Sequence, residues 1–97
     1  MTNDKKDKRY VGPVLRSGDF ASAVIEAIRE DNSGRDIRTE NHASYIRVQV
    51  QEECLIRLET VEEMLGRPVS HSDIEANMPS FEGFIETSQG QFKFRDR

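Results

Sequence analysis

The chain has 97 residues, of which 35% are hydrophobic and 33% are charged, and its formal net charge is −4. A chain of this length fits one domain with a thin core, because it buries only about 60–65% of its unfolded surface. Its 18 acids outnumber its 14 lysines and arginines, which argues against a nucleic-acid partner, whose phosphates would be repelled. The sequence lacks the roughly 20 apolar residues of a membrane span and the apolar run of a signal peptide. We therefore expect a cytoplasmic protein that does not bind membranes.

The N-terminal residues 1–9 are polar throughout, and we expect them to form a flexible tail ahead of a single domain over residues 10–97. Such a tail either keeps the protein soluble or becomes ordered on a partner, and the sequence leaves both interpretations open. Residues 10–16 alternate enough to predict a strand. Pro13 has no N–H group and favours a position at the edge of a sheet.

A helix is predicted to follow, with Asp19 as its N-cap and a stop at Asn32-Ser33-Gly34. Its large apolar side chains fall on one face, which we expect to enter the core: Phe20, Val24, Ile25 and Ile28.

Three extended segments come next, at residues 37–40, 45–50 and 54–58. Within the second, the alternation places Ile46, Val48 and Val50 inward. Cys54 in the third is the only cysteine, so an intramolecular disulfide is excluded, and a buried thiol is the simplest interpretation.

Two short helices are predicted in the second half of the chain. Thr60 and Glu63 have the spacing of a capping box for a helix over 61–65, which would end at Gly66. Ser70 and Asp73 predict another helix, ending near Asn77.

The last predicted element is a hairpin of residues 83–87 and 91–95. The order of elements is therefore β-α-β-β followed by β-α-α-β-β. It indicates an α+β fold with two similar halves, in which short helices pack on antiparallel sheet.

Residues able to perform catalysis or to hold a metal are few. The only soft ligands are His42, His71 and Cys54, and they do not form a CxxC, HxxxH or Glu-x-x-His motif. A Gly-x-Ser-x-Gly elbow and a glycine-rich nucleotide loop are also missing. We therefore expect no catalytic residue, no metal site and no bound cofactor, and a protein that is not an enzyme.

Residues 77–83 are predicted to form an irregular segment that presents side chains to a partner, since proline and glycine frame it. Phe81 and Phe84 flank Gly83 and should point to opposite sides of an extended chain. One of them would then be an exposed anchor for a partner, and burial of both in the core is the alternative.

Six segments of the chain, in this order, resemble a known family. They are Val11-Gly12-Pro13-Val14-Leu15-Arg16, Val24-Ile25-Glu26-Ala27-Ile28, Asp31-Asn32, Ala43-Ser44-Tyr45-Ile46-Arg47-Val48, Leu65-Gly66-Arg67-Pro68 and Asn77-Met78-Pro79-Ser80-Phe81-Glu82-Gly83. Together they are similar to the effector proteins, also called coupling or regulatory proteins, of bacterial multicomponent diiron monooxygenases. The resemblance is closest to the phenol, toluene and alkene types, and component B of methane monooxygenase is more distant.

The resemblance implies a cofactor-free protein that binds the diiron hydroxylase component of a hydrocarbon monooxygenase. Such proteins regulate oxygen activation, substrate access and the coupling of NADH use to hydroxylation. We expect the free protein to be a monomer. The residues that the resemblance places at the hydroxylase interface are Asn77, Met78, Pro79, Ser80, Phe81 and Gly83, with Val11, Gly12, Pro13 and Asn32 as weaker candidates.

Two other classes of function remain open from the residues alone. A small α+β regulatory domain could bind an anionic metabolite between helix and sheet, using Arg47 and Arg57. A small cofactor-independent enzyme would show turnover in isolation.

Overall fold

The computed structural model of the protein describes residues 9–96. The predicted tail therefore lies outside the described residues, apart from Arg9. The carbonyl of Arg9 accepts a hydrogen bond of 2.9 Å from the Glu52 amide, and its guanidinium lies 3.3 Å from the Asp96 carboxylate. Arg9 thus belongs to the folded domain.

The helices and strands follow the predicted order, with one addition. They are β1 (Tyr10–Arg16), α1 (Asp19–Asp31), β2 (Ile37–Asn41), β3 (Tyr45–Gln51), β4 (Glu53–Arg57), α2 (Leu58–Leu65), α3 (His71–Ala76), β5 (Ser80–Glu82), β6 (Phe84–Ser88) and β7 (Gln91–Arg95). The addition is β5, which lies where the sequence predicts an irregular segment.

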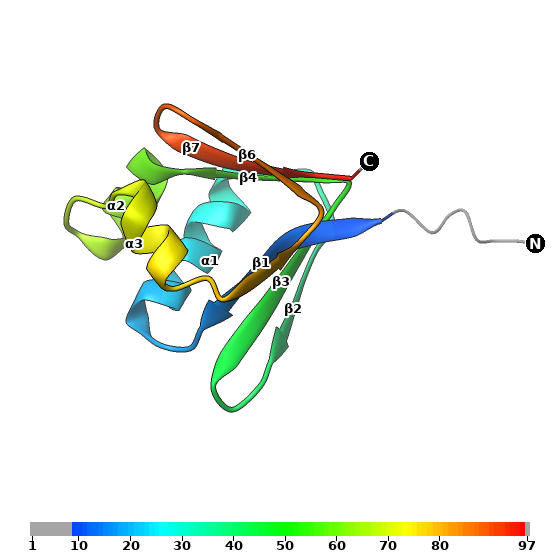
Figure 1. Ribbon diagram of the computed structural model, residues 1–97, viewed down its shortest axis with the longest axis horizontal. Coiled ribbons are helices and arrows are strands. Elements are labelled where there is room, and N and C mark those ends of the chain that lie inside the picture. The colour runs from blue at the N-terminus through cyan, green and yellow to red at the C-terminus, as the bar shows by residue number, and fades with distance from the viewer. Residues whose placement is uncertain (1–8, 97) are drawn as a thin grey trace, which may run out of the picture.

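The strands form two antiparallel sheets, with the orders β2-β3-β1-β5 and β4-β7-β6. The predicted α+β class is confirmed, with short helices packed beside antiparallel sheet (Figure 1). The two predicted halves correspond roughly to the two sheets. They are not separate, however, because β5 belongs to the second half of the chain and pairs with β1.

The predicted edge position of Pro13 is wrong, since β1 lies between β3 and β5. The pairing of β1 with β3 skips Gly12 and Pro13 and resumes at Val14, so the missing N–H group interrupts a ladder that is already open there. A side chain at Gly12 would also not fit, because its Cβ would lie 2.4 Å from the carbonyl oxygen of Val48.

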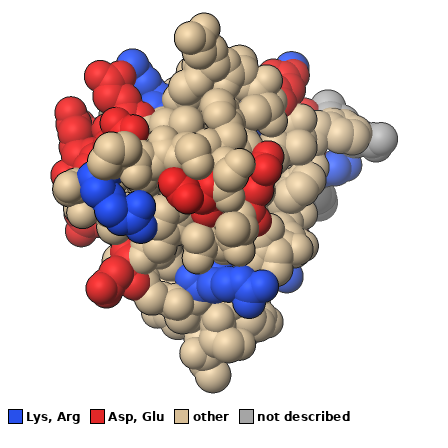
Figure 2. Space-filling view, turned by 60° about the vertical axis from the view of Figure 1, so that its left-hand side comes forward, with Lys and Arg blue, Asp and Glu red and all other residues tan. Residues whose placement is uncertain are grey.

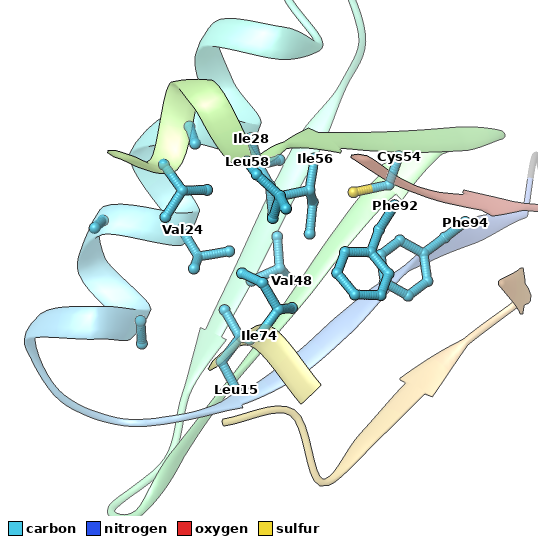
Figure 3. Packing of buried hydrophobic residues seen from close by; sticks show 14 of the residues in the cluster. Leu15, Val24, Ile28, Val48, Cys54, Ile56, Leu58, Ile74, Phe92 and Phe94 are labelled. Atoms are coloured by element: carbon cyan, nitrogen blue, oxygen red, sulfur yellow. The ribbon is translucent and has the colours of Figure 1, made fainter. Parts of the chain in front are cut away.

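The core lies between the two sheets and α1. Phe92 and Phe94 of β7 belong to it together with Val48 and Cys54, and Cys54 lies opposite Phe94 in the register of β4 with β7 (Figure 3). On α1, Val24 and Ile28 are buried as predicted, but Phe20 and Ile25 are only partly buried. Small side chains fill the rest of the buried face and let the helix approach the sheet closely: Ala21, Ala23 and Ala27.

Two of the predicted helix starts are wrong. Asp19 is the first residue of α1, and Gly18 occupies the cap position without a side-chain bond. Helix α2 begins at Leu58, before the predicted Thr60, because the Thr60 hydroxyl donates a 2.8 Å hydrogen bond to the Asp31 carboxylate at the end of α1.

The start of α3 and the end of α2 agree with the sequence. The Asp73 amide donates to the Ser70 hydroxyl at 3.1 Å, and the Ser70 amide donates to the Asp73 carboxylate at 2.9 Å, which completes the predicted capping box. Gly66 ends α2 in the left-handed conformation.

Candidate interaction surface

The predicted contact segment begins where α3 ends. Asn77 caps the helix, and its side-chain amide donates to the Asp73 carbonyl at 2.9 Å. The carbonyl of Asn77 accepts a 2.9 Å hydrogen bond from the Arg16 amide at the end of β1. Met78 follows, half-buried against the core. These two residues fix the direction in which the chain leaves α3.

The middle of the segment is β5, which holds one aromatic ring at the border of the core. Phe81 lies opposite Pro13 in the register with β1. Its ring centroid is 5.7 Å from that of Phe94, yet its side chain is 39% exposed. Pro79 and Ser80 are exposed beside it. Phe81 therefore contacts the core and remains available to a partner.

Gly83 carries the chain from one sheet to the other. Its φ is +99°, and an added Cβ would lie 2.7 Å from Cγ1 of Val11 and 2.8 Å from the carbonyl oxygen of Arg95. Only glycine fits this close approach without displacing its neighbours. The chain consequently passes from β5 directly into β6 at one corner of the molecule (Figure 1).

Phe84 is the most exposed large apolar side chain of the described residues, at 54%. It lies opposite Arg95 in the register with β7. The sequence did not decide whether Phe84 lies in the core or at the surface. The feature that pointed to an exposed ring was the presence of a second phenylalanine just after Gly83. We call the exposed residues Pro79, Ser80, Phe81, Gly83 and Phe84 the aromatic corner.

A surface hollow of about 350 Å³ adjoins the aromatic corner. Its lining combines apolar atoms of Val11, Gly83 and Phe84 with the polar groups of Tyr10 and Glu82, together with Arg9 and Asp96. The corner therefore offers both a projecting aromatic ring and a recess beside it.

Four of the predicted contact residues lie in the interior instead. Val11, Gly12 and Pro13 are buried in β1. Asn32 is 5% exposed, and its amide nitrogen donates to the carbonyls of Ile28 at 2.7 Å and Leu55 at 2.8 Å. These positions indicate that the four residues support the surface rather than form it.

The side chains with catalytic potential are used within the fold. Cys54 is buried, and burial, with the nearby Asp31 and Glu53 carboxylates, raises the pKa of its thiol. His71 Nε2 lies 2.9 Å from the Ser88 carbonyl oxygen, and the ring of His42 stacks on Tyr45 at 4.5 Å. Within residues 9–96, no three His, Cys, Asp or Glu side chains are grouped as a metal site would require.

The two arginines of the metabolite hypothesis lie in different sheets. Arg47 of β3 is 4.0 Å from the Glu82 carboxylate, and Arg57 of β4 is 3.7 Å from that of Glu59. The hollow beside Arg57 is lined mainly by acids, at residues 30, 31, 59 and 63. An anion would meet repulsion there.

The charged side chains on the side of the molecule that lies to the left in Figure 1 are interspersed by sign. Figure 2 shows acidic and basic groups on this face, some of them adjoining and others separated by uncharged areas. Among the helices of the described chain, none is long and apolar enough to cross a membrane.

These features define a small α+β binding protein, whose reactive side chains are engaged within the fold and whose aromatic side chains project at one corner. The chain belongs to the MmoB/DmpM family, whose model matches residues 9–95. The family resemblance seen in the sequence is thereby confirmed.

Two relatives show how far the similarity extends. The chain is 36% identical over 93 residues to the effector subunit of the alkene monooxygenase system of Xanthobacter autotrophicus (strain ATCC BAA-1158 / Py2), covering 96% of this chain and 92% of that protein. It is 30% identical over 78 residues to DmpM, the stimulatory component of phenol 2-monooxygenase of Pseudomonas sp. (strain CF600), covering 80% and 84%.

Solved structures agree with these relatives. A chain from a phenol hydroxylase–regulatory protein complex superposes with a TM-score of 0.77 and 26% identity, covering 91% of this chain and 98% of that one. Regulatory protein B of soluble methane monooxygenase gives a TM-score of 0.68 over 100% of this chain and 70% of its own, and at 20% identity it shows the fold alone.

Proposed function

We propose that this protein is a non-catalytic effector that binds the hydroxylase component of a multicomponent hydrocarbon monooxygenase. The observation that carries the proposal is its nearly full-length similarity to an alkene monooxygenase effector subunit. Regulatory proteins of the same fold are found in complexes with phenol hydroxylase. The effector works in the cytoplasm as a monomer until it binds, and it carries no cofactor, because the diiron centre belongs to the hydroxylase.

An effector of this kind acts by binding one conformation of the hydroxylase more tightly than another. To move a population from 1:99 to 99:1, the difference in binding free energy must be about 5.5 kcal/mol. A standard interface of about 800 Å² per partner can supply it. Through this shift the effector regulates oxygen activation, substrate access and the coupling of NADH use to hydroxylation.

The aromatic corner, with Asn77 and Met78 leading into it, is the proposed contact surface. Phe81 and Phe84 offer the large, stiff apolar area that dominates binding energies at protein interfaces. Val11, Gly12, Pro13 and Asn32 act indirectly, since they hold β1, β4 and α1 in place behind it.

The proposal is tested by adding the protein, from substoichiometric to excess amounts, to its cognate hydroxylase and reductase. We expect the product formed per NADH consumed to rise and then level off. A yield that stays constant over the whole titration contradicts the effector role. Stabilisation of the isolated protein by an anionic metabolite would support the rival class instead.

The surface is tested with Phe81→Ala, and Tyr45→Ala serves as the matched control. Both rings are partly exposed, at 39% and 37%, and each contacts one other ring. We expect Phe81→Ala to weaken hydroxylase binding by about tenfold or more, as a truncated anchor does, and Tyr45→Ala to have little effect. If Phe81→Ala unfolds the protein, its main role is in the core.

A further inference from the structure

The two edges of the three-stranded sheet differ in what covers their backbone groups. The strand order β4-β7-β6 leaves β4 and β6 each with one free side. The outward N–H and C=O groups of an edge strand pair readily with another chain unless something covers them.

The β4 edge is closed by the end of α1. The amide of Leu55 donates to Oδ1 of Asn32 at 2.8 Å, and Nδ2 of Asn32 donates to the carbonyl of Leu55 at 2.8 Å. The amide of Arg57 donates to the Asp31 carboxylate at 2.9 Å. The side chains of Asp31 and Asn32, at the C-terminal end of α1, thus make the hydrogen bonds that a neighbouring strand would make.

The β6 edge is open. Alternate residues of an antiparallel strand bond to opposite neighbours. Because Leu55 bonds to α1, Cys54 and Ile56 are the β4 residues that face β7. Their partners in β7 are Phe94 and Phe92, which therefore direct their backbone groups toward β4 and away from β6. Ile85 and Thr87 lie opposite these two residues in β6, so their own N–H and C=O groups are directed away from the sheet. Within the described part of the chain, no hydrogen bond reaches those groups.

The other sheet has β2 and β5 at its edges. Strand β5 is only three residues long, and the longer edge strand β2 lacks apolar anchors. The carbonyl of Asp36 accepts a 3.0 Å hydrogen bond from the Gln51 amide, so that Ile37 and Thr39 are the residues directed outward. Arg38 and Glu40 lie between and beside them, and charged side chains of this kind protect edges from pairing. In contrast, β6 begins with the exposed Phe84, and the exposed Phe81 lies just before it in β5.

We propose that β6 is a docking edge, to which an extended segment of the hydroxylase adds as a further strand through the backbone groups of Ile85 and Thr87. This inference rests on the proposed function and continues the aromatic corner along the chain. The pairing segment would place an apolar side chain beside Phe84 and a lysine or arginine beside Glu86, whose carboxylate also accepts a 2.7 Å hydrogen bond from Arg95.

A second copy of this chain is a poorer occupant. If two β6 strands paired antiparallel through Ile85 and Thr87, Glu86 would lie opposite Glu86. Like charges in that position are destabilising, and the ion pair of each Glu86 with its own Arg95, at 2.7 Å, offsets only part of this. Each copy also carries a net charge of −4. A hydroxylase segment with a cation in this position has neither problem.

The test is Thr87→Pro, which removes an outward N–H group and leaves the bonds to β7 in place. Thr39→Pro is the matched control, because it makes the same change at an outward position of β2. We expect Thr87→Pro to raise the Kd for the cognate hydroxylase at least about tenfold, as the loss of one backbone pairing implies. Thr39→Pro should leave the Kd within about twofold. Equal Kd values for the two variants would overturn the proposal.

Amide exchange in the wild-type protein gives an answer that does not depend on a variant folding. The Ile85 and Thr87 amides should exchange at least about tenfold more slowly when the hydroxylase is bound, while those of Ile37 and Thr39 keep their rates. Unchanged exchange at Ile85 and Thr87 overturns the pairing.

Two further outcomes separate this inference from its alternatives. If sedimentation shows a dimer that Thr87→Pro abolishes while hydroxylase affinity is kept, the edge serves self-association and the proposal is wrong. Suppose that the wild-type protein binds the hydroxylase and raises product per NADH while neither the Kd of Thr87→Pro nor the amide exchange of β6 changes. In that case only the strand pairing is wrong, and the proposed function stands. If the wild-type protein does not bind at all, the proposed function fails with it.

Discussion

The β4 and β6 edges belong to one sheet, and they are opposite in what covers them. At β4, Asn32 and Asp31 supply the donors and acceptors that a neighbouring strand would provide. At β6, the chain arrives through Gly83, and within the described residues the outward N–H and C=O groups of Ile85 and Thr87 have no hydrogen-bond partner. The difference teaches that an edge is closed by whichever side chains the fold brings to it, because the backbone offers the same groups everywhere.

The largest effect on this comparison is expected from Gly83→Ala, which changes the residue that leads the chain into β6. A Cβ there would meet Val11 and Arg95 at under 3 Å, and its φ is +99°, so we expect a loss of about 4 kcal/mol in the free energy of unfolding. Gly34→Ala is the matched control, because Gly34 has a φ of +93° and nothing within 4 Å, and we expect a loss of about 1 kcal/mol. Urea denaturation measures both. Similar losses would mean that the close approach at Gly83 is not essential.

A smaller effect is expected when the closed edge is opened by Asn32→Ala. The change leaves the half-buried amide and carbonyl of Leu55 without their partners, and we expect a loss of about 2 kcal/mol in the free energy of unfolding. Asn41→Ala, at an exposed position of β2, should change stability by less than about 0.5 kcal/mol. If both variants unfold at the same urea concentration as the wild type, water replaces the hydrogen bonds of Asn32 at the β4 edge without a loss of stability, and the expectation is wrong.

The smallest effect concerns the charged β2 edge. The Tyr10 hydroxyl donates a hydrogen bond to the Asp36 carboxylate, which lowers the pKa of Asp36, and Arg38 lies 4.1 Å from the Tyr10 ring centroid. Because the folded pKa is lowered, this stabilisation is present at neutral pH and is lost as the pH falls through that pKa.

We therefore expect Tyr10→Phe to lower Tm slightly at pH 7, and the difference from wild type to vanish in acid. Carboxyl NMR should show the pKa of Asp36 moving up toward its ordinary value in the variant. Tyr45→Phe is the control and should leave Asp36 unchanged. A Tm difference that persists in strong acid would point to packing rather than to this hydrogen bond.

The sequence predicted an element well where the residues that determine it lie close together in the chain. The Ser70 and Asp73 capping box spans three residues, and Gly66 ends α2 by its own conformation. The failures depend on distant residues. Thr60 is drawn away from a capping box by Asp31, 29 positions earlier, and β5 exists only because β1 lies beside it.

The contact surface was predictable to a similar extent. Proline and glycine marked residues 77–83 as a segment that presents side chains, and four of its six named residues are exposed: Pro79, Ser80, Phe81 and Gly83. The same kind of pattern at Val11-Gly12-Pro13 lies in the interior. Local composition does not separate the two cases, because burial of β1 comes from β3 and β5 on either side.

By itself, the sequence determined the α+β class, the acidic balance, most of the element order and the family. Only the tertiary structure decided which strand edge is covered and which is free. The reason is that the register of β4, β7 and β6 and the arrival of Asn32 at Leu55, 23 residues away, are contacts between distant segments. Such contacts form when the chain folds, and no short window of residues encodes them.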